Sequence, residues 1–450
     1  MDTDAIRSNG NSLTAASPHS SRQQFLRCFR PLHILSCTFA LWPFAVPVNG
    51  GSVFTRWSVL YVFAIVTGYS AFHLYINYTD AYGITASEEP DENRPTSATQ
   101  QQVEANFVSI VIDIYNRYSG LVLFWLLHTV ALATQRSLAA IVTGVLLVDE
   151  QIVQRLSLVP NHVQWCRFIC LQAAFIFLAI GVSEYHNCIM YMSDFIPASE
   201  YCIFQCFITM LTSSAVEIQY VAFVQLIKNR LQLMNELLVE LSTLMNSQSK
   251  ACEHISMKII NDIKNLYTHL HLLSLHINKA YGAQLIFILM TLFVTLTTLL
   301  YYCTMKLFRM LWMGWWATVS ELMLTFWAVL STLSWAFIST FRILRICNVC
   351  NSAKNEAQKI GSLIHGLGWK TNCPDTKSMV RILSLQLQQQ RIEFTAGGLF
   401  TIDHGLMFNI VGSLATYLLI LIQFDIAQNG AKWKAEQPAA NSSTTLQKLS

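Results

Sequence analysis

The chain has 450 residues, of which 53% are hydrophobic and only 12% are charged. Soluble domains carry about a quarter charged residues, so this composition excludes an ordinary soluble protein and indicates a membrane protein. The formal net charge of +3 comes from cations scattered along the chain, and without a basic block we expect no binding to nucleic acid.

The first 56 residues are predicted to form a cytoplasmic tail that carries one interfacial helix. The opening is polar, and no short apolar core with a cleavage site follows Met1, so we expect membrane insertion to depend on a later apolar segment. Residues 31–55 are uncharged, but they contain three prolines and two adjacent glycines. Such a broken stretch favours an interfacial or re-entrant helix, and a chain with eight spans remains the alternative.

Seven later segments are long and apolar enough to cross a bilayer, which takes about 20 residues of helix. Four of them lie within residues 57–227, two within 280–341, and the last within 399–424. Their predicted limits are 57–79, 118–135, 168–183, 201–227, 280–305, 322–341 and 405–424. The sequence therefore predicts an all-α integral membrane protein with seven transmembrane helices.

The distribution of cations predicts the orientation of these helices, because lysine and arginine gather near cytoplasmic helix ends. With the N-terminus in the cytoplasm, 22 of the 29 cationic residues fall in inner segments, and the first outer loop carries four acids within residues 88–92. The glycosylation sequons at Asn77 and Asn441 also fall outside. We therefore expect a cytoplasmic N-terminus and an extracellular C-terminal tail over residues 425–450.

The inner connections at 228–279 and 342–398 are long and have helical character. Apolar residues recur in them at steps of three and four, for example at Leu231, Met234 and Leu238. This pattern predicts that membrane helices extend into the cytoplasm, as a helical region and then as a helical anchor region. Whether these extensions hold subunits together or are plain helical hairpins stays open from the pattern alone.

None of the common catalytic motifs is present in the sequence. It lacks a phosphate-binding glycine loop, HExxH and GxSxG. His269 and His271 lie on different faces of one predicted helix, and Cys347 with Cys350 forms a lone CxxC pair, so neither indicates a metal site. We expect no enzyme activity, no cofactor and no metal.

The last predicted span carries a mostly polar stripe on one helical face. Its members follow steps of four, three, four and three residues: Asn409, Ser413, Thr416, Ile420 and Gln423. Polar groups that face lipid are costly, so we expect the stripe to face protein or water. It either bonds helices to one another or lines a water-filled path between several copies of the chain.

This span ends with Thr416-Tyr417, five apolar residues and Gln423-Phe424. The pattern resembles the TYhhhhhQF motif, with h an apolar residue, of the insect gustatory receptor family. Further positions resemble the family's lead-in to its last helix: Phe394-Thr395-Ala396, Gly398, Phe400, Ile402-Asp403 and Gly412. The residues that carry the resemblance span thirty-odd positions, and the expected topology agrees with it. The tail after Phe424 is longer than is usual in that family.

The resemblance implies a ligand-gated, non-selective cation channel in the plasma membrane of a sensory dendrite. It implies four identical subunits, or a heteromer with related receptors, whose last helices line one pore. Gln423 and Phe424 then fall at the gate, and Thr416 and Tyr417 on the coupling turn. Periodicity alone adds to the pore lining Asn409, Ser413 and Ile420. The implied ligand is a small tastant, such as a bitter compound, a sugar or a related polar molecule.

Candidates for the ligand pocket are polar or aromatic residues of the spans: Trp125, His128, Glu184, Tyr185, His186, Glu217, Glu321 and Trp327. Charges inside a membrane are costly and are often functional. Glu217 lies deep in the fourth span, so we expect it to have a cationic partner or to be protonated. Glu184 and Glu321 can instead lie at the headgroup boundary without a role in binding.

A G-protein-coupled receptor is the main alternative, because it also has seven spans. That class places the N-terminus outside, which would reverse the charge distribution and move both sequons into the cytoplasm. Its DRY-type triplet and NPxxY motif are absent from the sequence. A secondary transporter would show internal repeats, and the sequence has none that we recognise. The sequence therefore favours the channel.

Overall fold

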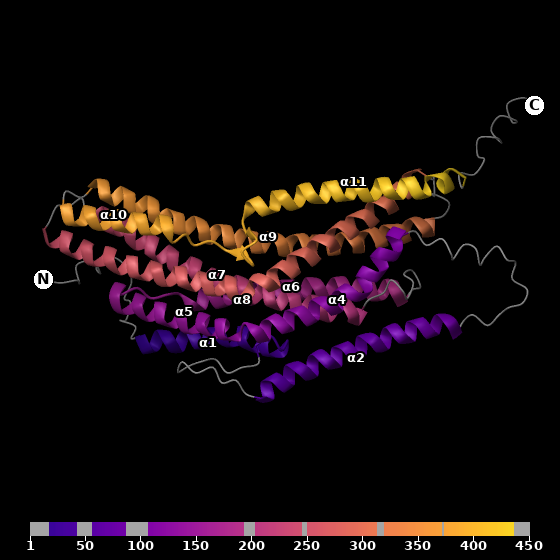
Figure 1. Cartoon of the computed structure of the whole chain (residues 1–450), viewed down its shortest axis with the longest axis horizontal. Helices are drawn as coiled ribbons and strands as arrows, with labels where there is room; N and C mark the ends of the chain where they lie inside the picture. The colour runs from indigo at the N-terminus through magenta and orange to yellow at the C-terminus, as the bar shows by residue number, and fades with distance from the viewer. Residues whose placement is uncertain are drawn as a thin grey trace, which may run out of the picture.

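The structure, a computed structural model, describes residues 18–42, 56–86, 107–192, 203–244, 250–312, 319–370 and 373–435. Within these ranges it is almost entirely helical. Its elements are α1 (Pro18–Thr38), α2 (Arg56–Ala86), α4 (Phe107–Ala133), α5 (Gln135–Leu156), α6 (His162–Met192), α7 (Ile203–Leu244), α8 (Lys250–Trp312), α9 (Val319–Lys370), α10 (Pro374–Gln389), β1 (Thr395–Ala396), β2 (Phe400–Thr401) and α11 (His404–Ala435). Figure 1 shows an elongated bundle with α2 and α11 at opposite edges.

The predicted fold class is confirmed, because the described residues contain seven helices that are long and apolar enough to cross a membrane. Six of them coincide with predicted spans: Trp57–Tyr78, His162–Asn187, Phe207–Leu244, Ser256–Phe308, Thr325–Gly368 and His404–Ala427. The seventh is Gln135–Leu156 in α5, whereas α4, which holds the second predicted span, contributes the shorter apolar run Arg117–Ala133.

α4 and α5 follow one another end to end, with a break at Thr134 (Figure 1). The predicted limit of the second span at residue 135 is therefore wrong, because Gln135 already begins the next helix. α4 has no charged residue after Arg117, whereas α5 carries the adjacent acids Asp149 and Glu150. Since charges in hydrocarbon are costly, we keep α4 as the second crossing and assign α5 as its continuation beyond the bilayer.

The N-terminal helix differs from its prediction. α1 begins at Pro18 and continues through Pro31 to Thr38, so the predicted start at residue 31 is wrong, and residues 43–55 lie outside the described residues. A proline in a helix interior costs about 3 kcal/mol. Burial offsets that cost: Phe25 and Phe29 are buried, and the Phe25 ring stacks on Trp165 of α6 at 6.3 Å between centroids.

The core lies where α7, α8 and α9 pack together, and every residue from Thr212 to Val224 of α7 is buried. These helices have 42, 63 and 52 residues. At about 1.5 Å per residue they are roughly 60 to 95 Å long, against about 30 Å of hydrocarbon. Within the predicted regions, residues 228–244, 250–279, 342–370 and 374–389 are helical, whereas residues 390–398 form a loop, β1 and a turn. Their cytoplasmic location stays a prediction.

Candidate functional site

The last helix, α11, lies at the edge of the bundle and packs against α8 and α9 (Figure 1). Leu414 is buried against Leu296 of α8 and Ala336 of α9. Nearer the C-terminal end, Tyr301 and Met305 of α8 receive the half-buried side chains of Leu418, Leu421 and Ile422. These contacts define one packed face of α11, which its own subunit covers.

The polar stripe lies on another face of the same helix. Asn409, Thr416 and Gln423 are exposed, and Ser413 is half-buried. At 100° per residue, the centre of the stripe lies about 150° around the helix from the centre of the packed face. The stripe therefore points away from its own subunit. The structure brings the predicted pore residues onto one uncovered surface, and it does not test their role.

The apolar members of the motif are also uncovered. Ile420 is 53% exposed and Phe424 is 43% exposed. Tyr417 is 53% exposed, and its ring lies edge-on to Phe293 of α8, with 5.9 Å between centroids. Tyr417 thus lies between the stripe and the packed face, where it contacts the neighbouring helix.

A short hairpin connects α10 to α11, and glycine makes it possible. Thr395 pairs with Thr401 and Ala396 with Phe400 in an antiparallel register. Gly397 and Gly398 close the turn with φ of +56° and +76°, a left-handed conformation that favours glycine. Figure 1 shows this hairpin at the base of α11. The lead-in residues of the sequence motif therefore form a tight structural joint.

α8 holds the hairpin in place through close backbone contact and hydrogen bonds. A Cβ on Gly282 would lie 2.7 Å from the Gly397 nitrogen, so the two backbones touch. The Asn278 amide nitrogen donates to the Glu393 carbonyl at 2.8 Å, and its oxygen accepts from the Thr395 amide at 3.1 Å. The long central helix α8 is thereby tied to the segment that starts α11.

Asp403 caps the N-terminus of α11 and was missed as a functional candidate. Its Oδ1 accepts the backbone amides of Gly405 at 2.9 Å and Leu406 at 3.4 Å, while Lys354 Nζ of α9 lies 3.2 Å from its Oδ2. Burial alone would raise the pKa of the Asp403 carboxyl, but Lys354 and the backbone amides hold that pKa below its usual range. A polar residue just before an apolar run was the available signal.

Two of the predicted pocket residues make hydrogen bonds between helices. The Trp125 indole donates to Ser70 Oγ of α2 at 2.8 Å. His128 is buried, and its ring nitrogens lie 2.9 Å from the Phe124 carbonyl and 3.0 Å from the Phe39 carbonyl. These contacts link α4 to α2 and to the end of α1.

Glu217 has the cationic partner that its depth predicts. Arg342 Nη2 donates to Glu217 Oε1 at 2.6 Å, and Arg345 Nη2 lies 3.4 Å from Oε2, with all three residues buried. A second buried ion pair joins Arg230 of α7 to Asp149 of α5 at 2.7 Å. Sequence gives no local signal for either pairing. Both pairs lie inside the core, where they join neighbouring helices.

Two further pocket candidates, His186 of α6 and Trp327 of α9, contact each other. The rings of His186 and Trp327 lie 5.7 Å apart, and His186 Nε2 is 3.5 Å from the Trp327 carbonyl oxygen. Glu184 and Tyr185 precede His186 on α6, half-buried and exposed respectively. The side chain of Glu321 lies outside the described residues. His186 and Trp327 are the only predicted pocket residues that a contact between described side chains joins.

The sequons remain predictions. Asn77 lies within α2, and its amide nitrogen is 3.0 Å from His73 Nδ1. Asn441 lies outside the described residues. Among the residues that the structure describes, no group of three or more His, Cys, Asp or Glu side chains could hold a metal ion.

These features define a seven-helix membrane protein whose last helix is only partly covered by its own subunit. The sequence matches the model of the 7tm chemosensory receptor family over residues 29–428. The chain therefore belongs to this family of chemosensory receptors.

The chain is similar to gustatory receptors of Drosophila melanogaster. Gustatory receptor 23a is 26% identical over 172 residues, which cover 38% of this chain and 43% of that receptor. Gustatory receptor for bitter taste 66a is 33% identical over 76 residues, which cover 17% of this chain and 14% of that receptor. The aligned segments thus span less than half of each relative. These similarities confirm the predicted resemblance to insect gustatory receptors.

A solved structure shares the fold over nearly the whole chain. It is that of the insect olfactory receptor OR5 from Machilis hrabei in complex with eugenol, with a TM-score of 0.58 and 11% identity. The match covers 90% of this chain and 99% of that chain. At this identity the likeness concerns the arrangement of helices, which is that of an insect chemoreceptor.

Proposed function

We propose that the chain is one subunit of a tastant-gated, non-selective cation channel in the plasma membrane, with α11 of four subunits around one pore. The observation that carries this proposal is the exposed polar stripe opposite the packed face of α11. In a lone subunit, the exposed amides of Asn409 and Gln423 would face lipid, where each unsatisfied polar group costs several kcal/mol. The Thr416 hydroxyl already donates to the Gly412 carbonyl at 3.0 Å. Four copies around an axis turn the stripe onto water and remove that cost.

The chemistry of the stripe suits weakly selective conduction. Neutral amides and hydroxyls replace part of an ion's hydration shell without binding the ion tightly. Gln423 and Phe424 form the gate near the extracellular end of the helix, and Ile420 adds an apolar collar one turn inward. The Tyr417 ring contacts Phe293 of α8. A movement of α8 therefore displaces Tyr417 and, with it, the gate residues of α11.

The ligand pocket of this proposal lies between α6 and α9, around Glu184, Tyr185, His186 and Trp327. With the N-terminus in the cytoplasm, this end of the bundle opens to the outside, where tastants arrive. The similar olfactory receptor was solved with eugenol, a small organic molecule, which supports a small-molecule ligand. The subunits are four copies of this chain, or this chain with related receptors, in the dendrite of a sensory neuron.

The proposal is tested at Gln423. Cells that express the chain alone are exposed to a tastant panel, and the reversal potential of the evoked current is measured in calcium and sodium solutions. Four carboxylates from Gln423→Glu would attract divalent cations, so we expect relative calcium permeability to rise by about twofold or more at equal surface expression. The control, Leu419→Ala, removes a side chain that is 58% exposed outside the stripe and keeps selectivity unchanged.

Unchanged selectivity in Gln423→Glu would argue against the pore assignment. The topology has a separate test, because a G-protein-coupled receptor would expose its N-terminus. An N-terminal epitope that antibodies reach in unpermeabilised cells would contradict the channel topology.

A further inference from the structure

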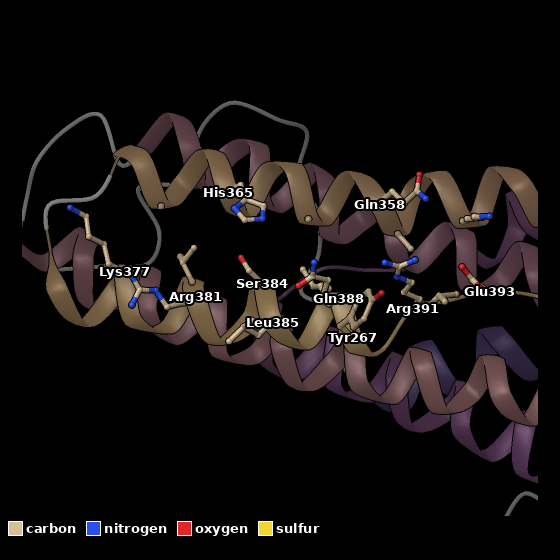
Figure 2. Close-up of a pocket in the computed structure, with 17 residues that line it drawn as sticks. Tyr267, Gln358, His365, Lys377, Arg381, Ser384, Leu385, Gln388, Arg391 and Glu393 are labelled. Atoms are coloured by element: carbon tan, nitrogen blue, oxygen red, sulfur yellow. The ribbon is translucent and has the colours of Figure 1, made fainter.

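A groove of about 940 Å³ runs between α9 and α10, away from the pore stripe and from the candidate tastant pocket. α9 contributes small residues to its wall, namely Ala357, Gly361 and Gly368. A Cβ on Gly361 would meet nothing within 4 Å, so the glycine opens onto free space. Figure 2 shows side chains of both helices pointing into the space between them. The volume suits a small molecule, since ligand sites measure about 300–1,000 Å³.

The groove carries an excess of positive charge. Its ionic lining consists of Lys354, Lys377, Arg381, Arg391 and Glu393. Lys354 is already paired with Asp403. In the described part of the chain, no ion pair joins an acid to the other three cations. Three cations therefore face one groove with a single carboxylate beside them.

Side chains that can donate hydrogen bonds lie at both ends of the groove. Lys377, Arg381, Ser384 and Gln388 follow steps of four, three and four, which place them on one face of α10. Figure 2 shows Lys377 and Arg381 at one end and Arg391 at the other. The Ser384 hydroxyl lines the groove and is shielded, yet it has no hydrogen-bond partner. Arginine forks and lysine charges at two ends match an anion with more than one phosphate.

We infer that this groove binds a polyphosphate anion, carried either on a phosphoinositide headgroup or on a soluble inositol phosphate. The inference rests on the proposed topology, which places residues 342–398 in the cytoplasm, where both kinds of anion occur. It assigns a second ligand site to the chain, distinct from that of the tastant. The excess of cations in its lining favours an anionic ligand over a neutral tastant.

The site is connected to the pore helix through Lys354. This lysine lines the groove, and its Nζ also lies 3.2 Å from Asp403 Oδ2 at the start of α11. A phosphate at this end of the groove competes with Asp403 for the same ammonium group. α10 also leads directly through the hairpin into α11. Occupancy of the groove therefore acts on the base of the pore helix from two directions.

The experiment uses the full-length receptor in phosphatidylcholine nanodiscs. In one arm, binding of inositol hexakisphosphate is titrated; in the other, phosphatidylinositol 4,5-bisphosphate is added to the disc and bound lipid is counted by native mass spectrometry. The double variant Lys377→Ala/Arg381→Ala should weaken binding about tenfold or more. The matched control Arg136→Ala/Lys258→Ala removes the same charge from exposed positions outside the groove and should bind normally.

A second variant keeps the cations of the groove and reduces the free volume between its walls. Gly361→Leu places a side chain at a groove position where an added Cβ meets nothing within 4 Å, so it should block binding while the receptor stays folded. Binding in the first arm alone identifies the soluble anion, binding in the second alone identifies the lipid, and both outcomes support the site. A receptor that binds the anion but passes no tastant-evoked current supports the site and counts against the channel.

Three results would overturn the inference. The first is no binding in either arm. The second is equal binding by wild type and Lys377→Ala/Arg381→Ala, or an equal loss in the control, which would indicate general charge attraction. The third is dissociation of the oligomer by Lys377→Ala/Arg381→Ala on size exclusion, which would make the groove a contact between subunits.

Discussion

Asp403 combines two interactions at one carboxylate, and its variants can separate them. Oδ1 caps α11, and Oδ2 pairs with Lys354. Asp403→Asn keeps a capping oxygen and loses the charge pair, which is worth about 0.2–1 kcal/mol near the surface. Asp403→Ala loses both and should cost about 1–2 kcal/mol. Lys354→Met should lower the stability by the same amount as Asp403→Asn, because it removes the same charge pair. Thermal unfolding in detergent, followed by size-exclusion chromatography, measures the three shifts.

The same carboxylate sets a pH dependence. The pKa of Asp403 is lowered in the fold, so its contribution to stability is complete above the unfolded pKa of about 3.9 and is lost as the pH falls through the folded pKa. The stability gap between wild type and Asp403→Asn should therefore stay constant from about pH 5 to 8 and shrink only in stronger acid. If the stability gap between the two proteins closes near neutral pH, the pKa of the Asp403 carboxyl is not lowered.

Residues were predictable where their signal is local. The stripe of α11 is periodic within one helix, and the structure places it on one uncovered surface. The cost of burying Glu217 predicted a partner, but Arg342 lies 125 positions away and nothing in the spacing identifies it. Trp125 and His128 are pocket candidates as polar or aromatic residues of the spans, and no local pattern identifies their hydrogen-bond partners. Their partners on α2 and α1 appear only once the helices are packed.

At the scale of elements, the hairpin before α11 depends on two backbones that touch. In Gly282→Ala, the new Cβ would lie 2.7 Å from the Gly397 nitrogen, so backbone has to move. Such overpacking costs about 1–3 kcal/mol. We expect a lower melting temperature and a weaker tastant response. Gly181→Ala is the control, since its Cβ meets nothing within 4 Å, and it should be neutral or slightly stabilising. Equal stability of the two variants would refute the close contact.

Element boundaries were harder to predict than element types. Long apolar runs identified the membrane helices, because length and hydropathy are properties of each segment alone. α1 starts thirteen residues before its predicted start at residue 31, because aromatic packing on α6 outweighs the proline. No proline or glycine lies at the break at Thr134, so the local sequence does not predict it. Such limits depend on tertiary contacts, which no local pattern contains.

At the scale of the whole molecule, α11 and α7 are both apolar but differ sharply in the share that the rest of the chain buries. In their most apolar windows, 78% of α7 is buried and only 6% of α11 is. Lipid can cover the apolar part of α11, but it cannot satisfy the exposed amides of Asn409 and Gln423. A single chain therefore leaves one surface unsatisfied, and a closed ring of identical subunits satisfies it in every copy at once.

This argument predicts that the chain, expressed alone, assembles as four copies. The receptor carries a fluorescent protein at its N-terminus, and bleaching steps are counted in single spots at the cell surface. A tetramer gives a maximum of four steps, and native mass spectrometry of the purified receptor should give four times the subunit mass. A membrane protein known to be monomeric, carrying the same tag, calibrates the count. A stable monomer that still passes tastant-evoked current would refute the shared pore, because one α11 cannot enclose a water-filled path.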